Sequence, residues 1–161
     1  MKTTLKIFIV VTMLFVSEIN AQFKPNSIYF ELLGNGGLYS INYDRLFTPT
    51  LGARIGFMYF SADNSIFDID QLILVPIMLN YFVGEGSSKL ELGAGIVFGS
   101  FKTDFWDLTN ESSSTAVIGT ATVGYRYQPV DGGFLFRAGF TPLFGSGGFL
   151  ASGGLSVGVA F

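Results

Sequence analysis

The sequence predicts an all-β fold, an eight-stranded antiparallel transmembrane β-barrel that follows a cleaved signal peptide. Three observations lead to this prediction. Apolar residues recur with a period of two, which is the pattern of strands rather than helices. Glycine makes up 21 of the 161 residues, and each glycine inside a helix would cost about 1 kcal/mol. Only 13% of the residues are charged, against about 25% in an ordinary soluble domain.

The N-terminal segment has the order of a secretory signal peptide. Lys2 and Lys6 give it a positive start, and a run of mostly apolar residues follows over 7–16. This run is far shorter than the ~20 apolar residues that a membrane-spanning helix needs. We therefore expect a signal peptide over 1–21 and an exported barrel domain over 22–161.

Eight segments of the exported domain alternate between the two faces of a strand. The last segment is the clearest case, because Leu155, Val157 and Val159 share one face while small residues occupy the other. Each segment reaches or nearly reaches the ~9–11 residues with which a tilted strand crosses a bilayer. An even number of strands would place both termini on the same side of the membrane. The predicted strands are 27–34, 37–47, 51–62, 69–83, 89–102, 115–128, 133–145 and 149–161.

The orientation of these strands follows from which face is apolar. One face is long and continuously apolar, and the opposite face is small and polar, which fits lipid outside and a narrow polar lumen inside. The lengths of the connections agree in part with a membrane barrel. The connections at 48–50, 84–88 and 129–132 are compact, while those at 62–68 and 103–114 are longer and more polar. Short periplasmic turns and longer extracellular loops are the usual asymmetry of such barrels. The two remaining connections, 34–37 and 145–148, are short and rich in glycine.

Aromatic residues fall near both ends of the predicted strands, as expected for rings at the level of the lipid headgroups. Arg45 shares the outward parity of its aromatic neighbours, and its guanidinium could reach the headgroups. The predicted bands are Tyr43, Phe47, Tyr81, Tyr125, Tyr127, Phe134 and Phe161 at the turn side, and Phe57, Tyr59, Phe98, Phe140 and Phe144 at the loop side.

Three segments, 34–45 (GNGGLYSINYDR), 136–142 (FRAGFTP) and 157–161 (VGVAF), resemble small outer-membrane β-barrel proteins of the OmpA/OmpX-like kind, in particular the short barrels of the Bacteroidota. The resemblance implies a location in the outer membrane of a Gram-negative bacterium. It also implies that an apolar last strand ending in phenylalanine is read by the barrel-assembly machinery, a role that would fall to Val157, Val159 and Phe161. It does not specify a biological role, because one fold serves many functions.

Strand parity also predicts which charged residues point into the lumen. Eight strands leave an interior just wide enough for side chains to fill, and a buried charge without a partner is costly. We therefore expect a structural ion-pair network, with a gated ion path or a small-ligand site as the functional alternatives. The network comprises three acids and three bases, Glu31, Asp44, Arg54, Glu91, Arg126 and Arg137, with Asn42 and Asn80 beside them.

The segment after the fifth predicted strand holds the only tryptophan and several carboxylates. It is an expected extracellular contact loop, with an acidic solvated loop or a weak Ca²⁺ site as the alternatives. Its spacing matches no EF-hand, so we expect no metal site. The residues concerned are Asp104, Phe105, Trp106, Asp107 and Glu111.

Composition narrows the function further. The chain contains no His and no Cys, so an imidazole base and thiolate chemistry are excluded, and we expect neither an enzyme nor a cofactor. The net charge of −3 gives no excess of basic residues with which the protein would bind nucleic acid. A wide porin is excluded because it needs 16–18 strands. We expect a structural or surface-interaction (adhesin-like) protein whose partners are outer-membrane lipid, the assembly machinery and an unidentified extracellular or cell-envelope molecule. The alternatives are an exported soluble calycin-like barrel that binds an apolar ligand, and a narrow gated channel.

Overall fold

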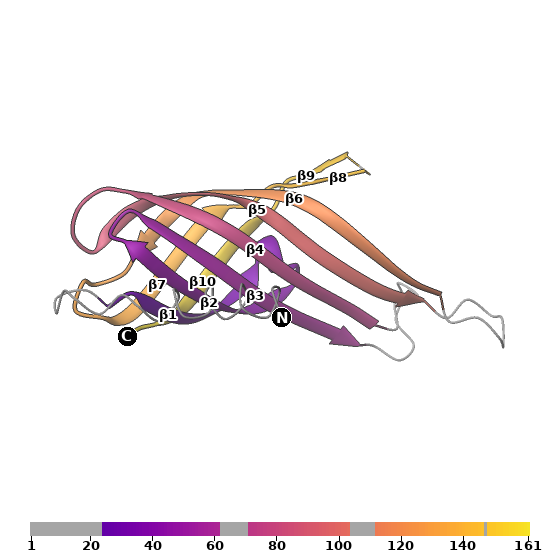
Figure 1. Ribbon diagram of the computed structural model, residues 1–161, viewed down its shortest axis with the longest axis horizontal. Helices are drawn as coiled ribbons and strands as arrows, with labels where there is room; N and C mark the ends of the chain where they lie inside the picture. Colours follow the sequence, from indigo (N-terminus) through magenta and orange to yellow (C-terminus); the bar gives the residue numbers. More distant parts are fainter. Residues whose placement is uncertain (1–23, 62–70, 104–111, 147) are drawn as a thin grey trace, which may run out of the picture.

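The computed structural model describes residues 24–61, 71–103, 112–146 and 148–161, which form one antiparallel sheet closed into a barrel (Figure 1). The predicted signal peptide lies outside these residues. Among them, no helix has the length and the apolar composition needed to cross a membrane. The elements are β1 (Asn26–Leu33), η1 (Gly34–Gly36), β2 (Tyr39–Thr48), β3 (Leu51–Ser61), β4 (Gln71–Val83), β5 (Ser88–Thr103), β6 (Ser112–Tyr127), β7 (Gly133–Phe140), β8 (Leu143–Gly145), β9 (Gly148–Leu150) and β10 (Gly153–Ala160).

The prediction of an eight-stranded antiparallel barrel is confirmed. Consecutive strands pair with each other from β1 to β7, and the barrel closes because β10 pairs with both β7 and β1. The seventh and eighth predicted strands are each interrupted. The seventh corresponds to β7 and β8, and the eighth corresponds to β9 and β10. Their pairing keeps one register across the interruption, since Phe140 pairs with Gly153 and Leu143 pairs with Leu150. Pro142 lies at the break in the seventh strand, and proline has no N–H to donate to the ladder.

The barrel wall is much taller on one side than on the other. β5 and β6 have 16 residues each and pair along their whole length, whereas β1, β7 and β10 have only 8 each. The start of β1 and the C-terminus lie where β2 joins β3, β4 joins β5 and β6 joins β7, and we call this the turn end. The Lys24 N–H donates to the Val130 carbonyl oxygen there, and the backbones of Asn26 and Phe161 bond to each other. The tall strands project at the opposite end, the loop end (Figure 1).

The connection between β1 and β2 differs from the prediction of a plain glycine-rich turn. β1 ends at Leu33 and β2 begins at Tyr39, and between them the chain forms the short 3₁₀ helix η1, whose three residues are all buried. Leu33 and Gly34 both adopt a positive φ, 59° and 85°. This conformation is natural for glycine and rare for leucine. The chain therefore turns sharply inward at the end of β1.

Along the strands, burial alternates as the sequence pattern predicts. The outward residues are large and apolar, and many are exposed, for example Leu79 at 62% and Val117 at 59%. Towards the turn end the inward residues are mostly polar, charged or small, with Tyr29 and Phe82 among the exceptions, and towards the loop end apolar residues such as Met58 and Val97 also point inward. The described strands therefore have an apolar outer surface, and most of their charged side chains lie inside.

Candidate functional site

The candidate site is the filled lumen of the barrel. It draws its charged side chains from six strands, and each side chain points inward because of its parity along its own strand. The six residues that the sequence analysis assigned to the lumen are all buried, with exposed fractions of 4% or less. They are Glu31 on β1, Asp44 on β2, Arg54 on β3, Glu91 on β5, Arg126 on β6 and Arg137 on β7.

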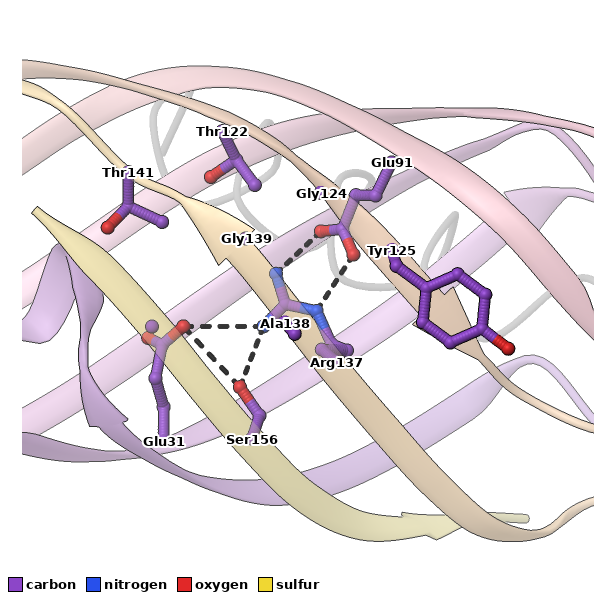
Figure 2. Close-up of a pocket in the computed structure, with 11 residues that line it drawn as sticks. Glu31, Glu91, Thr122, Gly124, Tyr125, Arg137, Ala138, Gly139, Thr141 and Ser156 are labelled. Carbon is purple, nitrogen blue, oxygen red and sulfur yellow. Dashed lines mark hydrogen bonds and ion pairs between the residues drawn. The ribbon is translucent and has the colours of Figure 1, made fainter.

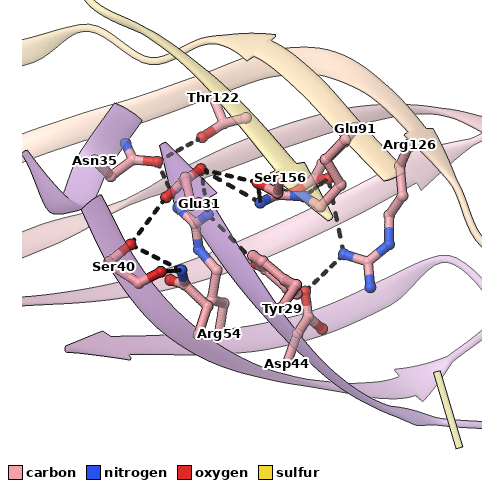
Figure 3. Close-up of polar contacts among 12 residues, drawn as sticks. Tyr29, Glu31, Asn35, Ser40, Asp44, Arg54, Glu91, Thr122, Arg126 and Ser156 are labelled. Carbon is pink, nitrogen blue, oxygen red and sulfur yellow. Dashed lines mark hydrogen bonds and ion pairs between the residues drawn. The ribbon is translucent and has the colours of Figure 1, made fainter. Parts of the chain in front are cut away.

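These six side chains, which we call the lumen network, form a continuous chain in which bases and acids alternate (Figure 3). The shortest links join Arg126 Nη1 to Asp44 Oδ2 and Arg137 Nη2 to Glu91 Oε1, both at 2.7 Å. Three longer links complete the chain. They are Arg54–Glu31 at 3.4 Å, Arg137–Glu31 at 3.5 Å and Arg126–Glu91 at 3.8 Å. With three charges of each sign, the network is neutral as a whole, which is the condition under which charges can be buried together.

Arg137 lies at the centre of the lumen network. It donates two hydrogen bonds to Glu91, from Nε to Oε2 at 2.8 Å and from Nη2 to Oε1 at 2.7 Å (Figure 2). This two-point geometry suits the planar guanidinium and fixes its orientation. Its Nη1 also donates to Ser156 Oγ at 3.3 Å, and its Cζ lies 4.8 Å from the centre of the Tyr29 ring. The sequence analysis did not identify Tyr29 or Ser156 as partners.

Arg126 organises the turn end of the lumen. Besides its ion pair with Asp44, it donates from Nε to Gln128 Oε1 at 2.8 Å and from Nη2 to Ser27 Oγ at 3.2 Å. Its guanidinium lies 4.9 Å from the centre of the Phe82 ring. These partners come from β1, β2 and β4 and from the residue just after β6, so one side chain ties distant parts of the wall together.

Asn35 is a site residue that the sequence analysis missed. It lies in η1, is fully buried, and bridges opposite sides of the lumen. Its Oδ1 accepts hydrogen bonds from Arg54 Nη2 and from Thr122 Oγ1, while its Nδ2 donates to Thr120 Oγ1 and to the Ala121 carbonyl oxygen. A lone asparagine in a run of glycines was the only signal, and such a run usually indicates a surface turn.

Glycine allows η1 to lie this deep. A Cβ on Gly34 would lie 2.8 Å from Glu31 Cδ, and a Cβ on Gly154 would lie 3.0 Å from Glu31 Oε1 and 3.1 Å from the Gly34 Cα. The backbone of η1 and that of β10 therefore approach the Glu31 carboxylate more closely than any other residue type would allow.

The two asparagines predicted beside the network are both buried, but they differ in their contacts. Asn42 Nδ2 donates to Ser40 Oγ at 2.8 Å. Asn80 pairs in register with Gly52 and Gly93, and its amide makes no hydrogen bond within the described part of the chain. Arg45, predicted to face outward, is half-buried, and its Nη1 donates to Asn26 Oδ1 at 3.4 Å.

Little space is left between these side chains. A cavity of about 10 Å³ lies beside Arg137, with Glu31, Glu91, Thr122 and Thr141 among its lining residues (Figure 2). A cavity of this size has room for about one water molecule. Within the described residues, no group of three or more His, Cys, Asp or Glu side chains could hold a metal ion. The arrangement is suited to filling the lumen and binding its walls together.

Two other groups of predicted residues lie apart from the lumen network. The contact-loop residues Asp104, Phe105, Trp106, Asp107 and Glu111 fall outside the described residues. Val157, Val159 and Phe161 point away from the lumen and are exposed. Val157 and Val159 lie on β10, the strand that closes the barrel against β1.

Comparison with known proteins gives no relative by sequence, since neither a protein-family model nor a curated protein matches the chain. Solved structures do match. The N-terminal β-barrel domain of Pseudomonas aeruginosa OprF shares 17% identity at a TM-score of 0.63, with 85% of this chain and 98% of that chain covered.

Two further barrels are similar to nearly the same extent. Ail, the attachment invasion locus protein of Yersinia pestis, shares 15% identity at a TM-score of 0.57, covering 86% of this chain and 99% of its own. Neisserial surface protein A shares 15% identity at a TM-score of 0.56, covering 83% and 94%. This chain therefore has the eight-stranded antiparallel fold of small outer-membrane barrels.

Proposed function

We propose that this protein is a small integral outer-membrane β-barrel with a structural or surface-interaction role and no open wide pore. The observation that carries the proposal is the reversal of polarity across the wall. The described strands expose large apolar side chains outward and bury a neutral network of six charges inside. A soluble barrel would bury the apolar side chains and expose the charges.

The outward surface supports lipid as its surroundings. Exposed apolar side chains recur along the outward faces of β1, β2 and β10, interrupted in β2 by Arg45, and they are also found on the outward faces of the tall strands. Soluble monomers rarely expose apolar patches larger than a few hundred Å². A soluble calycin-like carrier would also keep a central space for its ligand, whereas here side chains fill the described lumen around Arg137.

The lumen network supports a closed interior. A narrow channel would require the alternating ion pairs to separate, and each separation would leave a buried charge without its partner, at a cost of several kcal/mol. The structural role of the network therefore has more support than the gated-channel alternative. Recording single-channel currents in planar bilayers separates the two, since steady conductance from the native barrel would favour the channel.

The loop end supports a role in surface contact. β5 and β6 are the longest strands and end as the pair Thr103 and Ser112, and the chain between them carries the predicted contact residues. One of the similar barrels, Ail, is named as an attachment invasion locus protein. We infer that this end of the barrel faces the outside of the cell and that the barrel-assembly machinery reads the last strand.

Membrane insertion is tested by cell fractionation and by gel mobility. The native chain should partition into the outer-membrane fraction, require detergent for extraction, and run faster on a gel before boiling than after it. An epitope tag inserted after Ser113 should be labelled on intact cells. Recovery of the native chain as a soluble monomer without detergent would contradict the proposal, and labelling only after permeabilisation would reverse the orientation.

A further inference from the structure

The loop end of the barrel interior is apolar, unlike the charged lumen below it. β4 shows the difference in its sequence, because all residues from Leu72 to Leu79 are apolar, including those on the inward face. A strand with apolar residues on both faces is normally covered on both faces. Alternation with a polar inner face, seen in β1 and β2, is absent from this part of β4.

The inward apolar residues of neighbouring strands lie side by side through strand pairing. Phe60 pairs with Leu72 and Met58 pairs with Leu74, while Val97 pairs with both Pro76 and Ile118. Residues directly opposite each other in antiparallel strands share a face. We call this surface the apolar inner wall, and it consists of Met58, Phe60, Leu72, Leu74, Pro76, Val97, Ala116, Ile118, Leu143 and Leu150.

The described residues cover only the lower part of the apolar inner wall. η1 and the residue after it lie against the base, where a Cβ on Gly37 would come within 3.0 Å of Leu74 and 3.1 Å of Met58. Met58 and Val97 are accordingly buried. Higher up, Phe60, Leu72 and Ile118 are only half-buried, although they point inward.

The strand wall opposite the apolar inner wall is interrupted. The pairing of β2 with β3 ends at Ile41 and Phe57, so the last residues of β3, 58–61, pair only with β4. The outer edge of β9 likewise has no strand partner among the described residues. The side chains around this interruption are apolar and exposed. They include Leu33 and Leu38, each 55% exposed, and Leu150, 61% exposed. We call the edge of the barrel at Leu33 and Leu38 the low rim, and the apolar outer surface continues over it towards the apolar inner wall.

We propose that the apolar inner wall binds a hydrocarbon chain of a lipid from the surrounding bilayer, which reaches it over the low rim at Leu33 and Leu38. This inference rests on the proposed membrane insertion. The wall and rim carry no charged side chain, so they suit a ligand that needs apolar contact alone. Beneath them, the hydrogen bond that Asn35 Nδ2 donates to Thr120 Oγ1 forms a polar floor, which separates the hydrocarbon chain from the lumen network.

The test uses tryptophan fluorescence from two adjacent positions on β6. In a Trp106→Phe background, which leaves no other tryptophan, Ile118→Trp places the probe on the inner wall and Val117→Trp places it on the outer surface. Leu72→Trp on β4 is a second inner probe in case the first variant does not fold, with folding judged by heat-modifiable gel mobility. Each variant is reconstituted into phosphatidylcholine vesicles with and without brominated acyl chains, and iodide is the aqueous quencher.

The expected result is that brominated lipid reduces the fluorescence of the inner probe by a fraction comparable to that for Val117→Trp, while iodide has little effect on either. Quenching of the inner probe by iodide would show a water-filled space and overturn the inference. If neither brominated lipid nor iodide quenches the inner probe, protein covers the wall, and this result would also overturn the inference. In both cases quenching of Val117→Trp by brominated lipid would leave membrane insertion standing. If brominated lipid fails to quench Val117→Trp as well, the proposed function fails.

Discussion

The two halves of the barrel interior are built on different principles. In the half towards the turn end, every inward charge meets an opposite charge, and Arg137 and Arg126 together contact residues from most of the strands. In the half towards the loop end, the residues of the apolar inner wall take the place of the charges, and several of them are only half-buried. The first half is closed by its own side chains, whereas the second is apolar and only partly covered.

This contrast follows from the different lengths of the strands within one sheet. The short strands β1, β7 and β10 surround only the charged half, so that half is enclosed on all sides. The tall strands continue beyond the ends of these short strands, and there, within the described ranges, no strand of the short side faces their inner surface. Stability should therefore be concentrated in the lumen network, and substitutions in the apolar half should cost less.

The largest effect is expected for Arg137→Ala. Removing this guanidinium leaves Glu91 and Glu31 buried with weaker compensation, and breaking a buried pair in this way costs about 3–5 kcal/mol. The free energy of unfolding, measured by urea titration of the protein in lipid vesicles, should fall by that amount. Arg45→Ala is the matched control, because Arg45 is half-buried and a partly exposed contact contributes roughly 0–1 kcal/mol. Equal losses in the two variants would show that Arg137 is no more important than a surface base.

A smaller loss is expected for Asn35→Ala, which tests the boundary between the two halves. Arg54 Nη2 and the Thr122 hydroxyl both donate to Asn35 Oδ1, and the substitution removes this shared acceptor. Leaving buried polar groups unpaired costs about 1–3 kcal/mol. The same urea titration measures this loss, with Asn26→Ala as the control, since Asn26 is only half-buried at the start of β1. An unchanged free energy of unfolding would mean that η1 does not hold the two sides of the lumen together.

The close approach of β10 to η1 should be sensitive to a single methyl group. Gly154→Ala would place a Cβ 3.0 Å from Glu31 Oε1, and overpacking of this kind costs of order 1 kcal/mol. Gly153→Ala is the control, since its Cβ would meet its nearest described neighbour at an ordinary 3.4 Å. Thermal unfolding should separate the two variants. The close packing would be in doubt if Gly153→Ala were the more damaging.

The smallest effect is expected in the apolar half, for Ile118→Ala. Complete burial of an isoleucine side chain stabilises a protein by about 1.5–3 kcal/mol, and Ile118 is only half-buried and keeps its Cβ in this variant. The free energy of unfolding should therefore fall by less than about 1 kcal/mol. A loss as large as that of Arg137→Ala would remove the contrast between the halves and indicate a packed core at the loop end.

The sequence by itself determined the number of strands, their antiparallel order and the face on which each charge lies. This was possible because side-chain direction in a strand has a period of two and depends only on local geometry. Glu91 opposes the outward-facing Leu90 and Leu92 whatever the rest of the chain does. The inward positions of the six charged residues followed from the same rule.

Only the tertiary structure decided which charge meets which. Asp44 and Arg54 are direct neighbours in the pairing of β2 and β3, yet the short contact of Asp44 is with Arg126 from the far side of the lumen. The inward turn of η1, the burial of Asn35 and the incomplete cover of the apolar inner wall did not follow from the sequence pattern either. These features depend on distances across the barrel, which are set by the tilt and stagger of the closed sheet and not by any local period.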